Sequence, residues 1–126
     1  MKGGKVWFLH MMAGAVLFFL LTGHIALMHF SPGAMNEWSH PENPLSWGQV
    51  LTRARDIFSA IIYTLFIGIG LFHGFYGLFG ILTEVNTLKN YRKFIAIFLI
   101  ILGVFLFLYG TITTWYTTWY AFFYLK

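Results

Sequence analysis

The chain has no cysteine and little charge. Without cysteine in its 126 residues, it forms no disulfide of its own, ligates no iron–sulfur cluster and performs no thiol chemistry. Charged residues make up 10% of the sequence and hydrophobic residues 59%, whereas soluble domains usually carry about 25% charged residues. So few charges cannot cover a water-soluble core in a chain of this length. The composition therefore predicts an integral membrane protein.

Proline is also scarce, and all three prolines fall in one polar connection, residues 31–56. Apolar segments at 7–30, 57–83 and 94–116 each exceed the roughly 20 residues needed to cross a bilayer. The first is too long for a signal-peptide core, so we expect it to be retained. These segments predict an all-α membrane protein with three transmembrane helices, residues 1–126 forming a single transmembrane anchor domain.

The basic residues predict the orientation. Lys2 and Lys5 precede the first helix, and a second basic group follows the second helix in the connection 84–93. The positive-inside rule places both groups, and the N-terminus, in the cytoplasm, and the C-terminus outside. Residues 114–124, rich in Trp and Tyr, fit an outer interfacial belt. Because the basic residues flank apolar runs, the net charge of +4 does not indicate nucleic-acid binding.

Nearly every polar residue of the second segment falls on one helical face. At about 100° per residue, this face is expected to look toward protein or a cofactor, and the opposite Ile, Leu and Phe face toward lipid. Its members are Arg55, Asp56, Ser59, Tyr63, Phe66, Gly70, His73, Gly74, Gly77, Gly80 and Glu84.

The first segment carries a similar face. Two of its histidines, His10 and His24, share a stripe about 21 Å long, with His10 near the cytoplasmic end and His24 toward the outer end. The other members of the stripe are Ala13, Gly14, Leu17, Leu21 and Met28.

A histidine among glycines has two interpretations. Glycine faces commonly allow close helix packing in membranes, with the histidine hydrogen-bonded to a neighbouring helix. Alternatively, a neutral imidazole is a good axial ligand for haem iron. Because a porphyrin between helices needs side chains to be missing beside its ligand, His73 with Gly70, Gly74 and Gly77 favours the second interpretation.

The stretch 71–110 resembles the small membrane-anchor protein of succinate dehydrogenase and fumarate reductase complexes. The resemblance lies in a helix-two histidine, a glycine four residues later, "LT" with an acidic residue, and a third helix ending in "YG". In this sequence these are His73, Gly77, Leu82, Thr83, Glu84, Tyr109 and Gly110. Three helices and a length near 125 residues also agree.

The resemblance implies a subunit of succinate:quinone oxidoreductase, which links the tricarboxylic acid cycle to the respiratory chain. It implies a bacterial or archaeal cytoplasmic membrane. The expected partners are a flavoprotein, an iron–sulfur protein, a second membrane-anchor protein and quinone. His73 matches the axial ligand of a b haem iron, with the second ligand expected from the other anchor protein.

Two departures from the family pattern matter. Val85 follows Glu84, where one-haem members have a quinone-binding tyrosine; Tyr76 or Tyr91 could replace it. Some relatives hold two haems, with a further ligand on the first helix, and His24 fits that description. The chain therefore looks closer to the two-haem type, whose members often reduce menaquinone.

The remaining candidate residues have open alternatives. His10 and Glu84 could bond a haem propionate, a quinone or the iron–sulfur protein, while Glu84 could equally be a solvated helix-end carboxylate. Arg55 could pair with a propionate or serve as an interfacial anchor. Two other function classes stay open, namely a haem b subunit of another quinone-linked oxidoreductase and a haem-free structural anchor. The direction of catalysis, succinate oxidation or fumarate reduction, is not encoded in these motifs.

Overall fold

The computed structural model describes residues 3–30, 50–51 and 54–124, and the side chains of residues 27–30, including Met28, lie outside the described part. It contains helices α1 (Gly3–Phe30), α4 (Ile57–Glu84) and α5 (Arg92–Tyr124), with a short 3₁₀ helix η1 (Lys89–Tyr91) before α5. Three helices are long and apolar enough to cross a membrane. No strand occurs in the described ranges. The prediction of an all-α chain with three membrane-length helices is confirmed.

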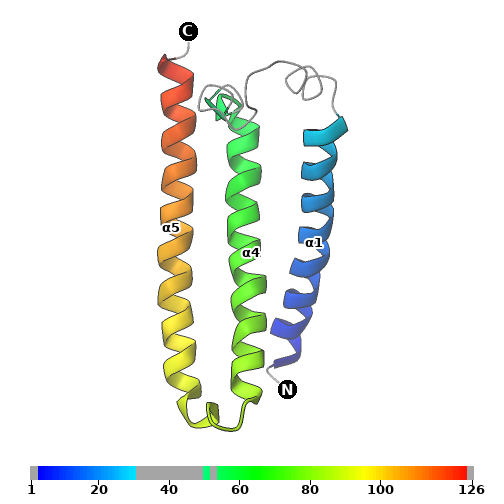
Figure 1. The fold of residues 1–126 in the computed structure, drawn as a ribbon, viewed down its shortest axis with the longest axis vertical. Helices are drawn as coiled ribbons and strands as arrows, with labels where there is room; N and C mark the ends of the chain where they lie inside the picture. The colour runs from blue at the N-terminus through cyan, green and yellow to red at the C-terminus, as the bar shows by residue number, and fades with distance from the viewer. Residues whose placement is uncertain (1–2, 31–49, 52–53, 125–126) are drawn as a thin grey trace.

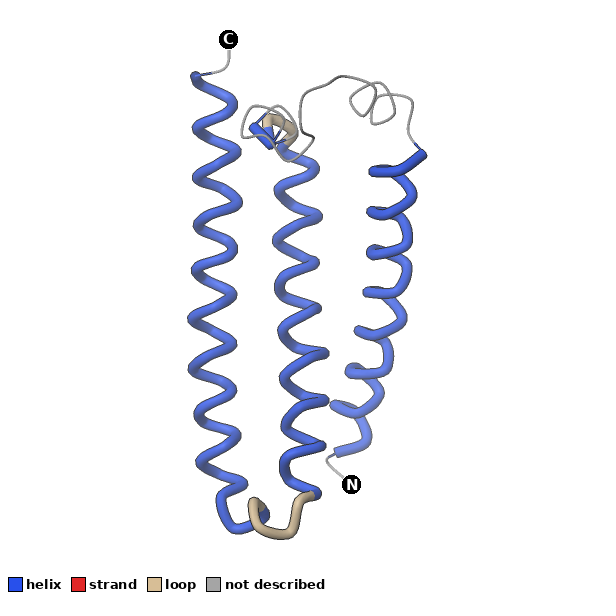
Figure 2. Tube along the Cα trace, viewed as in Figure 1, coloured by secondary structure: helices blue, strands red, loops and turns tan. Residues whose placement is uncertain are grey.

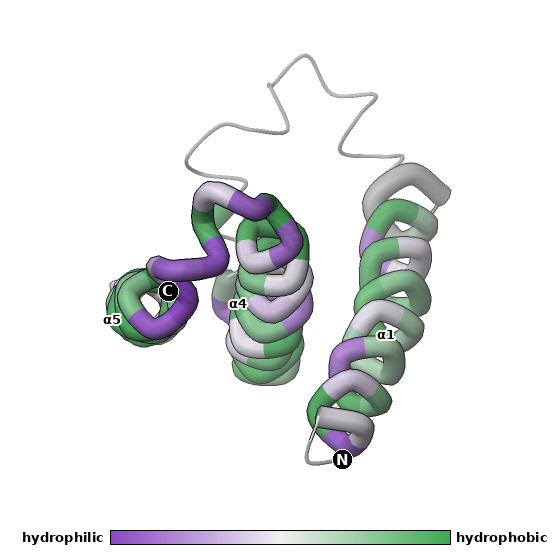
Figure 3. The backbone as a smooth tube through the Cα atoms, turned by 90° about the horizontal axis from the view of Figure 1, so that it is seen from below, coloured by the Kyte–Doolittle hydropathy of each residue, from purple (hydrophilic) through white to green (hydrophobic). Residues whose placement is uncertain are grey.

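The three helices form an open row rather than a closed bundle (Figure 1). Helix α4 lies in the middle and contacts both α1 and α5, whereas no contact joins the described residues of α1 and α5. The view along the helices shows the same row (Figure 3), and the tube trace shows that successive helices run antiparallel (Figure 2). We call the two ends of the row the Asp56 end, where α4 begins, and the Lys89 end, where α4 meets η1.

The predicted lipid face of α4 instead packs against α5. A Cβ added at Gly103 of α5 would lie 3.0 Å from a ring carbon of Phe75, and one at Gly110 would lie 3.1 Å from Ile67. Conversely, a Cβ at Gly68 of α4 would lie 3.2 Å from Phe107. The expectation that this face meets lipid was wrong. Because glycine has no side chain, the large apolar side chains of one helix pack closely over the glycines of the other. Helix α4 is therefore packed on two opposite faces, by α1 and by α5.

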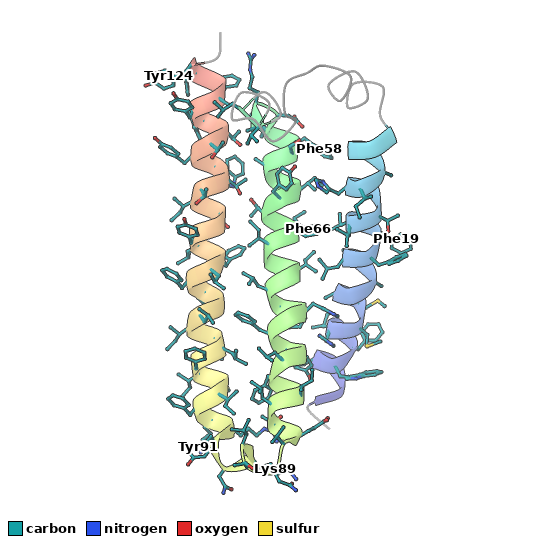
Figure 4. The ribbon with its side chains drawn as sticks, viewed as in Figure 1. Phe19, Phe58, Phe66, Lys89, Tyr91 and Tyr124 are labelled. Atoms are coloured by element: carbon teal, nitrogen blue, oxygen red, sulfur yellow. The ribbon has the colours of Figure 1, made fainter. Side chains whose placement is uncertain are left out.

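The row has almost no interior of its own. No large side chain in the described part is fully buried, and Phe19 of α1 points away from α4 with 72% of its surface exposed (Figure 4). The residues that are buried are mostly small: Ala13, Leu51, Ala60, Leu99, Thr118 and Ala121. Because dispersion contacts need atoms on both sides, most apolar surface here requires lipid or another chain.

Helix α5 extends beyond the predicted segment 94–116. Its 33 residues span about 50 Å, against a hydrocarbon thickness of about 30 Å. The prediction ended where threonine, tyrosine and tryptophan lower the hydropathy. No proline or glycine follows Gly110 to end the helix. The hydroxyls of the four threonines from Thr113 to Thr118 bond within it, as Thr117 does to the carbonyl of Thr113 at 2.8 Å.

Basic residues from both predicted cytoplasmic groups lie at one end of the row. Lys5 is in the first turns of α1, and Lys89, Arg92 and Lys93 surround the junction of η1 and α5. Since α1 and α4 are antiparallel (Figure 1), these residues share the Lys89 end. The assignment of that end to the cytoplasm stays a prediction.

Asp56 caps the N-terminus of α4. Its carboxylate accepts hydrogen bonds from the backbone N–H groups of Phe58 (3.2 Å) and Ser59 (3.0 Å), and from the Ser59 hydroxyl (2.8 Å). The Ser59 hydroxyl, together with these N–H groups, lowers the pKa of the Asp56 carboxyl below its usual 3.8. The helix therefore begins at Ile57 because its first free N–H groups are satisfied there.

We expect Asp56→Ala to destabilise α4 at neutral pH, and Asp56→Asn to retain most of the cap, since asparagine is an equally good N-cap residue. Because the pKa is lowered in the folded state, the stabilisation is complete above 3.8 and is lost as the pH falls through the lower folded value. Thermal unfolding followed by circular dichroism at neutral pH and at about pH 3 measures both effects. An unchanged midpoint for Asp56→Ala at neutral pH would contradict the capping role.

Candidate functional site

Two histidines predicted on inward faces meet between α1 and α4. The imidazole rings of His10 and His73 are stacked, with centroids 4.2 Å apart and planes inclined by 8°. Both residues are half-buried. The predicted polar face of α4 and the predicted stripe of α1 thus pack against each other, as the sequence indicated for both helices.

Each histidine faces a glycine of the other helix. A Cβ added at Gly14 of α1 would lie 2.8 Å from Cε1 of His73, and a Cβ added at Gly77 of α4 would lie 3.4 Å from Cε1 of His10. The sequence carries the same spacing twice, as "HMMAG" at residues 10–14 and "HGFYG" at residues 73–77. Residues four apart share a helical face, so antiparallel helices can place each ring over the partner's glycine.

His10 lies deeper than its predicted position near the helix end. Helix α1 begins at Gly3, not at residue 7. His10 is therefore about 10 Å inside the helix, and His73 lies about 16 Å before the end of α4. The earlier start places the two rings at similar depth. This pairing was missed because the Lys5-containing segment was excluded from the first helix.

His73 is held as one tautomer by α1. Its Nδ1 lies 3.1 Å from the backbone carbonyl oxygen of His10. A carbonyl can only accept, so Nδ1 carries the proton, and the neutral ring keeps a lone pair on Nε2. Histidines that bind metals commonly donate their other N–H to a backbone carbonyl in this way. The contact therefore fits both interpretations, a packing histidine hydrogen-bonded to a neighbouring helix and an imidazole that could ligate haem iron through Nε2.

The stacking of the two rings limits the role that His10 could have in binding haem. Two axial ligands of one iron point their nitrogens at each other from opposite sides of the porphyrin, whereas these two rings lie face to face. His10 and His73 in this arrangement cannot be the two axial ligands of one haem. At most one of the two histidines could therefore ligate a given haem iron in this arrangement.

The glycines around His73 differ in their surroundings. Gly77 faces the ring of His10, and a Cβ at Gly70 would lie 4.0 Å from Leu17, so both glycines contact α1. Gly74 is exposed, and nothing lies within 4 Å of a Cβ placed there. Packing between helices explains why residue 77 is a glycine. The open space beside His73 that a porphyrin would need lies at Gly74.

His10 has an unsatisfied nitrogen. Its Nδ1 is buried and has no hydrogen-bond partner, although buried polar groups are normally paired. The ring also contacts Tyr76, with centroids 5.0 Å apart. Of the two tyrosines considered for a quinone, Tyr76 is thus near His10. Tyr91, in η1, is 60% exposed at the Lys89 end (Figure 4).

The other predicted site residues lie at the ends of α4. Glu84 is exposed as its last residue, and Arg55 is exposed just before its first. His24 is exposed on α1, and its ring meets Tyr63 edge-on, with centroids 6.1 Å apart. Within the described residues, no three or more His, Cys, Asp or Glu side chains gather to hold a metal ion.

Comparisons with protein-family models, with curated proteins and with solved structures gave no match. The roles of the site residues therefore rest on their contacts and on the sequence motif.

Proposed function

We propose that this chain is the membrane-anchor cytochrome b subunit of a succinate:quinone oxidoreductase. The observation that carries the proposal is His73, hydrogen-bonded through Nδ1 to the carbonyl of His10 and left with a free Nε2 lone pair in a glycine-lined helix contact. The resemblance of residues 71–110 to the small membrane-anchor protein of these complexes supplies the family, and three membrane-length helices agree with it.

In this proposal His73 is one axial ligand of a b haem. The carbonyl of His10 orients the imidazole, and Gly14 leaves the space that the ring occupies. Gly74 leaves room beside the ligand. Bound haem supplies one-electron transfer, and the second axial ligand comes from the partner anchor protein.

The open row of helices supports the existence of that partner. Helix α4 contacts α1 on one side and α5 on the other, and no other described element covers its two remaining sides. Large apolar side chains on all three helices are exposed. A second anchor protein would cover part of this surface. The flavoprotein and the iron–sulfur protein would bind at the Lys89 end, which the positive-inside rule assigns to the cytoplasm.

Quinone reduction is proposed at the same end. His10 and Tyr76 lie together and Glu84 and Tyr91 lie nearer the connection, so these side chains could bond the quinone, menaquinone in the two-haem type. Glu84 is the last residue of α4. Its present exposure is that of the isolated chain.

A second haem on His24 forms the finer part of the proposal, with Arg55 as a partner for a propionate. We expect two b haems per pair of anchor proteins, because His24 and His73 lie at different depths along the row. Pyridine haemochrome analysis against protein concentration measures the ratio. A ratio of one would leave His24 with a structural role beside Tyr63.

The whole proposal is tested by purifying the complex from its native membrane. A reduced-minus-oxidised spectrum should show b haem, and the co-purifying proteins should include a covalent flavoprotein and an iron–sulfur protein. Haem with other soluble partners would indicate a different quinone-linked oxidoreductase. Absence of haem would indicate a structural anchor, an alternative that the packing of Gly14 and Gly77 against histidines favours.

A further inference from the structure

A half-open cavity whose walls carry several hydroxyl groups among mostly apolar surface lies near the Asp56 end, away from His73. Its volume is about 390 Å³, and it is lined by His24 of α1, Ser59 and Tyr63 of α4, and threonines of α5. Residues Val50 and Ala54 of the connection also line it. The size falls in the range of small-ligand sites. Polar groups on the walls of a cavity between membrane helices are costly unless something bonds to them.

Apart from that of Tyr63, the hydroxyl groups of the walls already donate a hydrogen bond within the protein. The Ser59 hydroxyl donates to Asp56, and each threonine hydroxyl donates to the backbone carbonyl four residues before it in α5. These threonines are Thr113, Thr114, Thr117 and Thr118. A hydroxyl that has donated retains lone pairs that can accept. The hydroxyls of Ser59 and of the threonines therefore act in this cavity as hydrogen-bond acceptors.

A threonine hydroxyl elsewhere between α4 and α5 both donates and accepts a hydrogen bond. The Thr64 hydroxyl donates to the carbonyl of Ala60 at 2.8 Å and accepts a hydrogen bond from Nε1 of Trp115 at 3.1 Å. The Thr64 hydroxyl already donates its hydrogen bond, so its free lone pair accepts one from the indole N–H, a group that can only donate. The threonines of the cavity have no such donor in the described part of the chain.

We propose that this cavity binds a primary ammonium group. An ammonium presents three N–H donors and no acceptor. It therefore complements hydroxyl groups that already donate and can only accept a further hydrogen bond. Water, alcohols and quinols also carry acceptor lone pairs, for which, among the described lining residues, the side chains of Tyr63 and His24 could supply a hydrogen-bond donor. The carboxylate of Asp56, bonded to Ser59, places a negative charge near the site, and the half-exposed ring of Tyr63 offers a cation–π surface.

The proposed source is the headgroup of an aminophospholipid. The cavity lies near the helix ends, beside the Trp- and Tyr-rich end of α5, and such aromatic residues prefer the interface where headgroups lie. The phosphate of the same headgroup would be accommodated by the exposed guanidinium of Arg55, next to the lining residue Ala54. In this proposal His24 and Arg55 belong to a headgroup site, so it is an alternative to the second haem on His24 and leaves the haem on His73 unaffected.

The first test uses the unmodified complex. It is placed in nanodiscs with equal amounts of phosphatidylethanolamine and phosphatidylcholine of identical acyl chains, and retained lipid is identified by native mass spectrometry. The two headgroups share their charges, but the trimethylated one has no N–H donor. We expect about tenfold preference for phosphatidylethanolamine, because hydrogen bonds with charged donors are among the stronger ones. Equal retention would overturn the proposal.

The second test locates the preference. The double variant Thr114→Val/Thr117→Val removes two acceptors with little change of shape and should abolish it, while Thr114→Ser/Thr117→Ser should keep it. Thr111→Val is a control on the same helix outside the cavity lining, where the buried hydroxyl has no hydrogen-bond partner in the described residues. A preference that survives the valine pair, with helix content unchanged by circular dichroism, would overturn the proposal.

Competition separates the two sources of ammonium. Methylammonium that displaces the retained phosphatidylethanolamine, where tetramethylammonium does not, supports a site for any primary ammonium. Retention of the lipid against both supports a site specific for the headgroup. Displacement by both to the same extent would show that N–H donation is not recognised and would overturn the proposal.

Discussion

We expect His73→Leu to remove one b haem per chain from the purified complex, while the chain still inserts into the membrane. The variant lacks the Nε2 lone pair that the Nδ1 bond to the His10 carbonyl leaves available. Leucine is apolar and of similar bulk, so packing against Gly14 is largely retained. The reduced-minus-oxidised spectrum measures the loss, and the amount of chain in washed membranes measures insertion.

His10→Leu is the matched control for this prediction. The two rings are stacked and equally half-buried, so both variants lose comparable packing. The backbone carbonyl that orients His73 is still present in His10→Leu, and the haem should stay, with a changed midpoint potential where His10 contributes to its surroundings. Equal haem loss in both variants, or full haem content in His73→Leu, would mean that His73 only packs.

Gly14→Leu and Gly74→Leu are expected to have opposite effects on the stability of the haem-free chain. At Gly14, even a Cβ would lie 2.8 Å from Cε1 of His73, so a leucine must push the ring away and separate α1 from α4. Overpacking of this kind commonly costs about 1–3 kcal/mol. The isolated chain should therefore unfold at a lower temperature in detergent.

At Gly74, nothing in the described part of the chain lies within 4 Å of an added Cβ. The Gly74→Leu chain without haem should unfold at the wild-type temperature or above it, since leucine favours the helix over glycine by about 0.8 kcal/mol. Its haem content in the complex should nevertheless fall sharply, because the leucine would occupy the space beside the ligand. Full haem content in Gly74→Leu would show that this space faces lipid.

Gly77→Leu distinguishes the two interpretations less cleanly. A Cβ at this position already lies 3.4 Å from the ring of His10, so the substitution disturbs the helix contact whether or not a porphyrin lies nearby. Residue Gly77 belongs to the family motif, yet its neighbour in this chain is a side chain of α1. Helix packing is therefore the role that the contacts give it.

The helices and the inward face of α1 could be predicted from the sequence, because hydropathy and a period of 3.6 residues are local properties. The start of α4 at Ile57 is likewise local, since Asp56 caps it. The end of α5 was predicted too early, because composition indicates where a helix leaves hydrocarbon and not where it stops. His10 and His73 were both selected, but their contact depended on a start of α1 that hydropathy alone places too late.

The sequence by itself determined that the chain forms three membrane-length helices. Its many apolar residues and few charges could not be covered in water and therefore require lipid. The sequence also determined which histidines share faces with glycines. Only the tertiary structure decided that α4 lies between α1 and α5, that the rings of His10 and His73 stack, and that committed threonine hydroxyls line a cavity. These features depend on how glycines and side chains of different helices interlock, which is a property of pairs of residues far apart in the chain.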